Sequence, residues 1–82
     1  MANKSFFRRM AEEKGLMNEE ITVTFQGVTH FMTTENVIDL IEQAPKHEQD
    51  HIKKTFSQID YLNGDLSHYI RFLGEAFIKF NY

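Results

Sequence analysis

The chain has 82 residues and a formal net charge of −3, and 41% of its residues are hydrophobic. This length fits one small domain, and the apolar fraction is too high for a disordered chain. The charge balance excludes a polycationic nucleic-acid binder, and the absence of cysteine excludes disulfides and cysteine-ligated zinc. The sequence has neither a signal-peptide core nor an apolar run near the roughly 20 residues of a membrane span. We therefore expect a single cytoplasmic domain over residues 1–82 with no membrane partner.

The N-terminal segment predicts a short amphipathic helix over Ser5–Lys14. Its apolar side chains fall within one arc of the helical wheel, while Arg8, Arg9 and Glu12 occupy the other side. Ser5 can cap the start of this helix, and the following Gly15 can end it. This pattern is typical of a helix that packs on a core.

The segment Glu20–Thr33 alternates apolar and polar residues, which predicts a β-hairpin that turns at Gly27. A two-residue loop would pair Val23 with His30 and point His30 inward, whereas a bulge at the glycine would point Phe31 inward. We favour the bulge, because it exposes the polar ring and buries Phe31. Two strands alone are marginal in water, so the hairpin must pack on helices or extend across a partner.

Three helices are predicted after the hairpin, over Thr34–Ala44, Pro45–Tyr61 and Leu66–Phe80. Pro45 both ends the first of them and can open the second, because a missing N–H costs nothing at the start of a helix. An Asn-Gly break and an Asp65 cap precede the third. The predicted fold class is α+β: a short N-terminal helix, one antiparallel β-hairpin, then three helices packed on it, in the order α-ββ-α-α-α.

The middle helix carries His47-Glu48-Gln49-Asp50-His51, which resembles the zincin metallopeptidase motif over these five positions. In that motif two histidines one helical turn apart hold zinc, and the glutamate acts as a general base. The resemblance implies a zinc-dependent hydrolase, for which Glu75 is the best-spaced third ligand.

Other features of the segment weigh against that activity. A charged Asp50 stands where zincins usually have an uncharged residue, and the helical wheel places His47 and His51 away from the apolar stripe of their own helix. We interpret the segment as a solvated helix face supported by an ion pair from Asp50 to Lys54. We therefore expect no catalytic residue, no metal site and no cofactor, and the protein is not expected to be an enzyme.

A small nucleic-acid-associated regulator is the alternative function, because the two helices around Pro45 could form a helix-turn-helix. Such a reader needs a basic recognition surface, yet Lys53 and Lys54 are offset by acidic neighbours on the same helix. We expect no nucleic-acid partner.

The last predicted helix has an apolar arc wider than one facing layer can cover. Tyr69, Phe72, Ala76 and Phe80 form its outer flank, which is either core or an interface with another chain. We predict the interface. The expected function is a non-enzymatic interaction or regulatory module that forms a homodimer and contacts a further protein partner.

Overall fold

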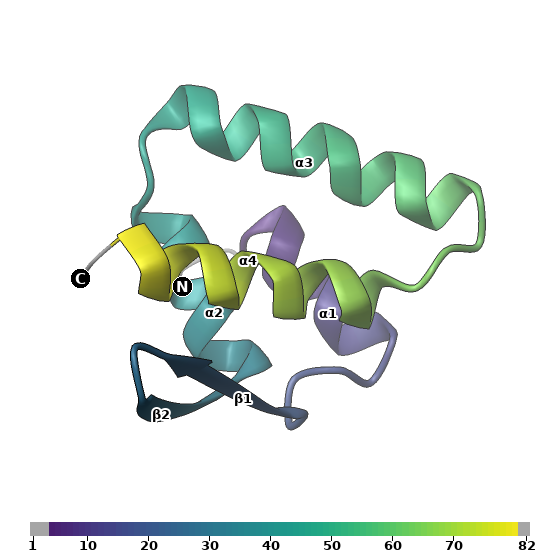
Figure 1. Ribbon diagram of the computed structural model, residues 1–82. Helices are drawn as coiled ribbons and strands as arrows, with labels where there is room; N and C mark the ends of the chain where they lie inside the picture. The colour runs from purple at the N-terminus through teal and green to yellow at the C-terminus, as the bar shows by residue number, and fades with distance from the viewer. Residues whose placement is uncertain (1–3, 81–82) are drawn as a thin grey trace.

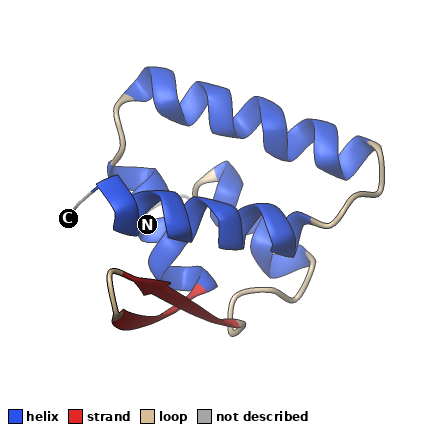
Figure 2. Cartoon of the chain, viewed as in Figure 1, coloured by secondary structure: helices blue, strands red, loops and turns tan. Residues whose placement is uncertain are grey.

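The elements of the fold follow the predicted order. The computed structural model describes residues 4–80, with four helices and two strands in that range. In chain order they are α1 (Phe6–Glu13), β1 (Glu20–Phe25), β2 (Val28–Thr33), α2 (Thr34–Gln43), α3 (Lys46–Tyr61) and α4 (Leu66–Phe80). The two strands form one antiparallel sheet (Figure 2). The predicted α+β class and its α-ββ-α-α-α order are confirmed.

Helix α4 lies between α3 on one side and the hairpin on the other (Figure 1). It packs against β1 and α2, while α1 joins α2 and α3 behind it. The chain reverses direction after α3, so α3 and α4 run antiparallel and the start of α3 lies beside the end of α4 (Figure 1). None of the helices within residues 4–80 combines the length and the apolar character needed to cross a bilayer.

The hairpin turns through a two-residue loop, so the bulged register favoured from the sequence is wrong. Val23 pairs with His30, which lies on the inner face and is half-buried. Phe31 lies on the outer face and is 81% exposed. Both loop residues, Gln26 and Gly27, have positive φ angles of 53° and 79°. A loop with two left-handed residues matches the right-handed twist of the strands, and this geometry fixes the register against the burial preference of Phe31.

Side-chain caps set the starts of three helices, and the sequence predicts two of them, at Ser5 and Asp65. At α1 the Ser5 side chain accepts a hydrogen bond from the backbone N–H of Arg8. At α4 the Asp65 side chain accepts one from the backbone N–H of His68. Thr33 and Asn36 form a reciprocal capping box at α2. Pro45 stands at the cap position of α3 rather than inside it and offers no side-chain cap, so α3 begins one residue later than predicted.

The core lies where α4, α2 and β1 meet, and α1 and α3 close it from the remaining sides. Hairpin burial comes mainly from β1, because Ile21 and Val23 point inward beneath α4 while most of β2 stays accessible. The sheet is thus stabilised by helices within the same chain. The buried apolar residues are Phe7, Ala11, Ile21, Val23, Val37, Ile38, Ile41, Ile52, Phe56, Leu66, Ile70 and Leu73.

Arg8 joins α1 to α2 through three carboxylates. Its Nη2 atom lies 2.6 Å from Asp39 Oδ1 and 3.0 Å from Glu42 Oε1, and Nη1 lies 3.6 Å from Glu35 Oε1. The hydrogen bond from Arg8, reinforced by one from Ser5, holds the pKa of the Glu42 carboxyl below its usual value. The same carboxylate raises the pKa of the Arg8 guanidinium. Arg8 therefore docks α1 onto α2, while Arg9, Glu12 and Glu13 of the same helix stay exposed.

Candidate interaction groove

The four residues predicted as an interface lie on one flank of α4 and line a single groove. Phe72 and Phe80 are 59% and 87% exposed, whereas Tyr69 and Ala76 are half-buried. Side chains of α3 form the opposite wall, so two helices define the hollow. The structure brings all four predicted residues together, and their contact with another molecule stays a prediction.

The groove between α3 and α4 has a volume of about 570 Å³. Buried Ile52 and Leu73 and half-buried Phe77 give it an apolar base. Its width is set by the antiparallel helices, which place the first turns of α3 beside the last turns of α4 (Figure 1). The full lining is His47, Glu48, His51, Ile52, Tyr69, Phe72, Leu73, Ala76, Phe77 and Phe80.

A run of aromatic contacts connects this groove to the core. Phe7 packs edge-on against the fully buried Phe56, with ring centroids 5.3 Å apart. Phe56 packs edge-on against Tyr69 at 5.8 Å, and Tyr69 stacks on Phe72 at 6.2 Å. Edge-to-face and offset-stacked pairs at these separations are favourable. The exposed ring of Phe72 is therefore held by a contact that leads into the interior.

The histidine motif of α3 lies at the rim of the same groove, a position that the sequence did not predict. His47, Glu48 and His51 are all exposed, as predicted, but they line the groove opposite the aromatic residues of α4. A helical wheel gives the direction of the two histidines only relative to the apolar stripe of α3 itself. Phe72 and Phe80 of α4 extend the apolar surface toward them, and that extension depends on how the two helices dock.

The donor set within one chain does not support a catalytic zinc centre. Glu75, the third ligand that the motif resemblance suggested, is not among the residues that line this groove. Across residues 4–80, no cluster of three or more His, Cys, Asp or Glu side chains is arranged to hold a metal ion. A catalytic zinc site typically uses three protein ligands and a water. The predicted ion pair from Asp50 to Lys54 is wrong. Asp50 pairs instead with Lys46, one turn earlier, with 3.4 Å between Lys46 Nζ and Asp50 Oδ1.

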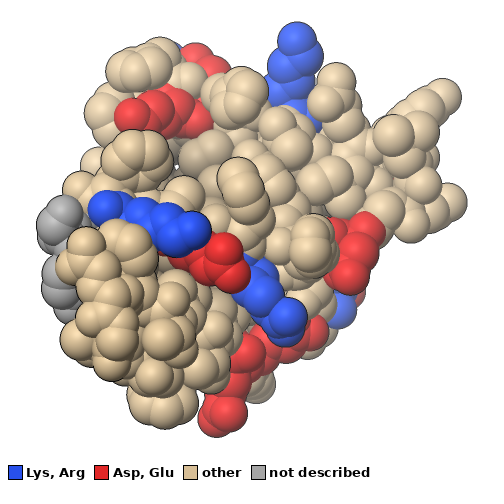
Figure 3. All heavy atoms as spheres, viewed as in Figure 1, with Lys and Arg blue, Asp and Glu red and all other residues tan. Residues whose placement is uncertain are grey.

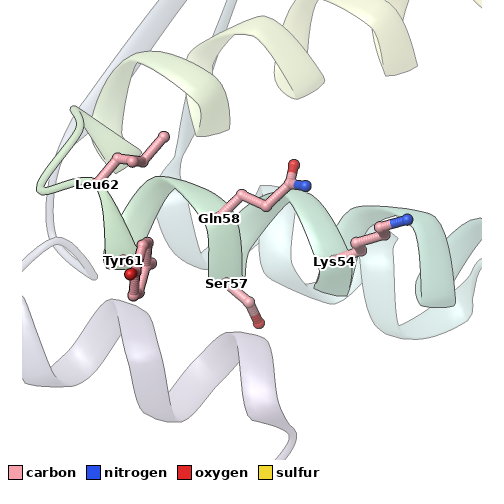
Figure 4. A pocket seen from close by; sticks show the side chains of 5 residues that line it. All are labelled: Lys54, Ser57, Gln58, Tyr61 and Leu62. Atoms are coloured by element: carbon pink, nitrogen blue, oxygen red, sulfur yellow. The ribbon is translucent and has the colours of Figure 1, made fainter.

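A second hollow, of about 740 Å³, lies at the C-terminal end of α3 (Figure 4). Lys54, Ser57, Gln58, Tyr61 and Leu62 line it, and all five belong to α3 or its first following residue. Their side chains point in different directions and do not converge (Figure 4). This hollow is the open surface of one helix end rather than an enclosed site, although Tyr61 and Leu62 are both strongly exposed.

Acidic and basic side chains are interleaved on the face drawn in Figure 3. Lys14 lies 2.7 Å from Asp60, and Lys4 lies 2.8 Å from Glu12, so their positive charges are locally neutralised. Nucleic-acid binding relies on uncompensated basic side chains that displace counterions from phosphates. The expectation of no nucleic-acid partner stays a prediction, and this charge pattern supports it.

No protein-family model, curated protein or solved structure matches this chain.

Proposed function

We propose that this protein is a non-enzymatic interaction module that self-associates through the groove between α3 and α4. One observation carries the proposal: exposed aromatic rings and an apolar hollow occur on the same surface. Aromatic side chains on such surfaces favour association because each buries a large area and loses little conformational freedom.

A second copy of the chain is the occupant that this surface fits best. A two-fold interface is isologous, so one patch must supply both the projecting groups and the hollow that receives them. Phe72 and Phe80 project from α4, and Ile52, Leu73 and Phe77 line the hollow beside them. Tyr69 and Phe72 are already stacked, which reduces the entropy lost when the partner docks.

The energetics indicate a weak dimer. Burying one phenylalanine ring contributes about 1.5–3 kcal/mol, and Phe72 and Phe80 of two copies supply four partly exposed rings. Association costs at least about 4 kcal/mol in lost translational and rotational freedom. The net gain is then at most about 8 kcal/mol, which corresponds to about 1 µM, and we expect a dissociation constant between this limit and about 1 mM.

The test is sedimentation equilibrium of the wild type and Phe72→Asp over a wide concentration range. The variant places a carboxylate at the edge of the groove and leaves the core residues Leu73 and Ile70 in place. We expect the wild-type mass to rise above 9.7 kDa with concentration and the variant to remain a folded monomer. If folding requires the dimer, the melting temperature of the wild type should rise with concentration.

Phe31→Asp is the matched control, because Phe31 is strongly exposed on the outer face of the hairpin and lies outside the groove. It should associate as the wild type does. A wild-type chain that stays at 9.7 kDa up to about 1 mM contradicts the proposal. Loss of the dimer in Phe31→Asp but not in Phe72→Asp would place the interface on the hairpin instead.

A further inference from the structure

His47 and His51 form a pair of free imidazoles one helical turn apart on α3. Both side chains are exposed and line the groove, and neither imidazole makes a hydrogen bond or ion pair within the described part of the chain. Positions i and i+4 of a helix face the same way, which is the spacing at which two histidines chelate one zinc ion.

A single chain supplies only part of a zinc site. Zinc typically takes four ligands in a structural site. The described residues offer no third His, Cys, Asp or Glu arranged with this pair. The remaining ligands must then come from another molecule.

A two-fold contact through the groove can supply them. The histidines line the surface that the dimer would bury. A two-fold axis that passes beside them would bring each histidine opposite the same residues of the partner. Such a contact can set His47 and His51 of one copy opposite His47 and His51 of the other. The ligands would then number about four imidazoles, the set that tetrahedral zinc accepts.

Charge also favours a divalent cation at this place. Glu48 is the one acidic residue among those that line the groove, and no Lys or Arg lines it. Two copies facing each other would bring two Glu48 carboxylates to one interface, where like charges are destabilising without compensation. A divalent cation held by the adjacent imidazoles offsets both charges.

We propose that zinc bridges two copies of this chain through His47 and His51 of each, and so strengthens their association. This inference rests on the proposed self-association through the groove. Zinc here is structural and performs no reaction. The zincin-like spacing is then used for joining two chains rather than for hydrolysis.

The test is a zinc titration of metal-free, tag-free protein, followed by sedimentation and by calorimetry. We expect about 0.5 zinc per chain, since typically four imidazoles share one ion, and a dimer dissociation constant lowered by about tenfold or more. A chelator should reverse the effect. Magnesium should not reproduce it, because magnesium prefers oxygen ligands.

His51→Ala should abolish the zinc effect, and His68→Ala is the matched control because His68 is exposed on α4 outside the groove. One zinc per chain without a change of mass overturns the inference, as does an unchanged zinc effect in His51→Ala. A zinc-linked dimer that Phe72→Asp does not weaken also overturns it. If the protein associates without metal, depends on Phe72 and shows no change on adding zinc, only the zinc bridge is overturned. If the wild type never associates, the proposed function is overturned as well.

Discussion

The ring of Tyr69 stacks on the ring of Phe72, with centroids 6.2 Å apart and an interplanar angle of 15°. Tyr69 also meets the buried ring of Phe56 edge-on, at 75°. One residue thus touches both the core and the exposed aromatic surface of α4. Side chains three positions apart on a helix are neighbours, so the stack is a local consequence of the Tyr69/Phe72 spacing. It restricts the Phe72 ring before any partner arrives.

Replacing Tyr69 with leucine should therefore affect stability and association together. The variant removes both ring contacts, and we expect a loss of about 1–2 kcal/mol in the free energy of unfolding. Phe72 would regain rotamer freedom, and the dimer should weaken by roughly threefold to tenfold. Denaturant unfolding and sedimentation measure the two effects. Tyr69→Phe is the control, because its ring can keep the contacts with both Phe56 and Phe72. Equal losses of stability and of association in the two variants would contradict the stacking role.

The double substitution of His47 and His51 by alanine should leave the metal-free protein nearly unchanged in stability. Both side chains are exposed and form no hydrogen bond, ion pair or ring contact within the described residues, so we expect a change below about 0.5 kcal/mol. Chemical denaturation in metal-free buffer is the measurement. A larger loss there would mean that these histidines support the fold itself, whereas a cooperative loss of structure on adding chelator to the wild type would mean that a bound metal ion supports it.

The sequence was sufficient for features that local chemistry decides. Hairpin alternation, the Ser5 cap and the Asp65 cap each depend on residues close in the chain, and the structure has all three. The hairpin register could not be predicted in this way, because both pairings preserve alternation on β1 and only the loop geometry distinguishes them. Burial of Phe31 was the wrong criterion, since a two-residue turn with left-handed Gln26 and Gly27 was the stronger constraint.

Features that depend on docking of distant elements could be predicted only in part. The aromatic flank of α4 followed from its helical wheel, but its opposite wall on α3 did not, since the approach of two helices is a tertiary property. The same holds for Arg8, whose partners lie far along the chain on α2. An arginine opposite an apolar stripe gives no sign of those partners, although Glu35, Asp39 and Glu42 on successive turns of one helix indicate a surface that needs a cation.

Replacing Arg8 with methionine should destabilise the protein by about 1–2 kcal/mol at neutral pH, because three neighbouring carboxylates lose their common partner. Arg9→Met is the matched control, because Arg9 is exposed on the adjacent position of α1. It should change the free energy of unfolding by less than about 0.5 kcal/mol. Urea unfolding at pH 7 compares the two, and equal losses would show that the network is not stabilising.

The Arg8 effect should also depend on pH. The pKa of Glu42 is lower in the folded protein than its usual value of 4.5, so the unfolded chain takes up the proton first as the solution is acidified. This contribution is therefore fully present above about pH 5 and is lost as the pH falls from near 4.5 through the lowered folded pKa. The stability difference between the wild type and Arg8→Met should narrow over that window. A gap that stays constant down to about pH 2 would contradict the assigned cause.

Gly74 lies where α4 packs closely against the hairpin and α2. A Cβ atom there would lie 3.2 Å from Met32 Sδ and 3.3 Å from Val37 Cγ2, both closer than ordinary contact. Valine adds further methyl groups to this buried place, and we expect Gly74→Val to lose about 1–3 kcal/mol of stability. Alanine gains up to about 1 kcal/mol in helix propensity, which the crowding offsets because only the Met32 side chain can move easily.

Gly74→Ala should therefore lie close to the wild type, and the difference between alanine and valine contains the packing cost together with the lower helix propensity of valine. Ser57→Val tests valine at an exposed position of α3, where only helix propensity acts and the loss should stay below about 1 kcal/mol. Denaturant unfolding of all variants at one protein concentration is the measurement, because self-association would otherwise shift the apparent stability. If Gly74→Val unfolds with the same free energy as Ser57→Val, then α4 is not closely packed against Met32 and Val37, and a glycine is not required at this crossing.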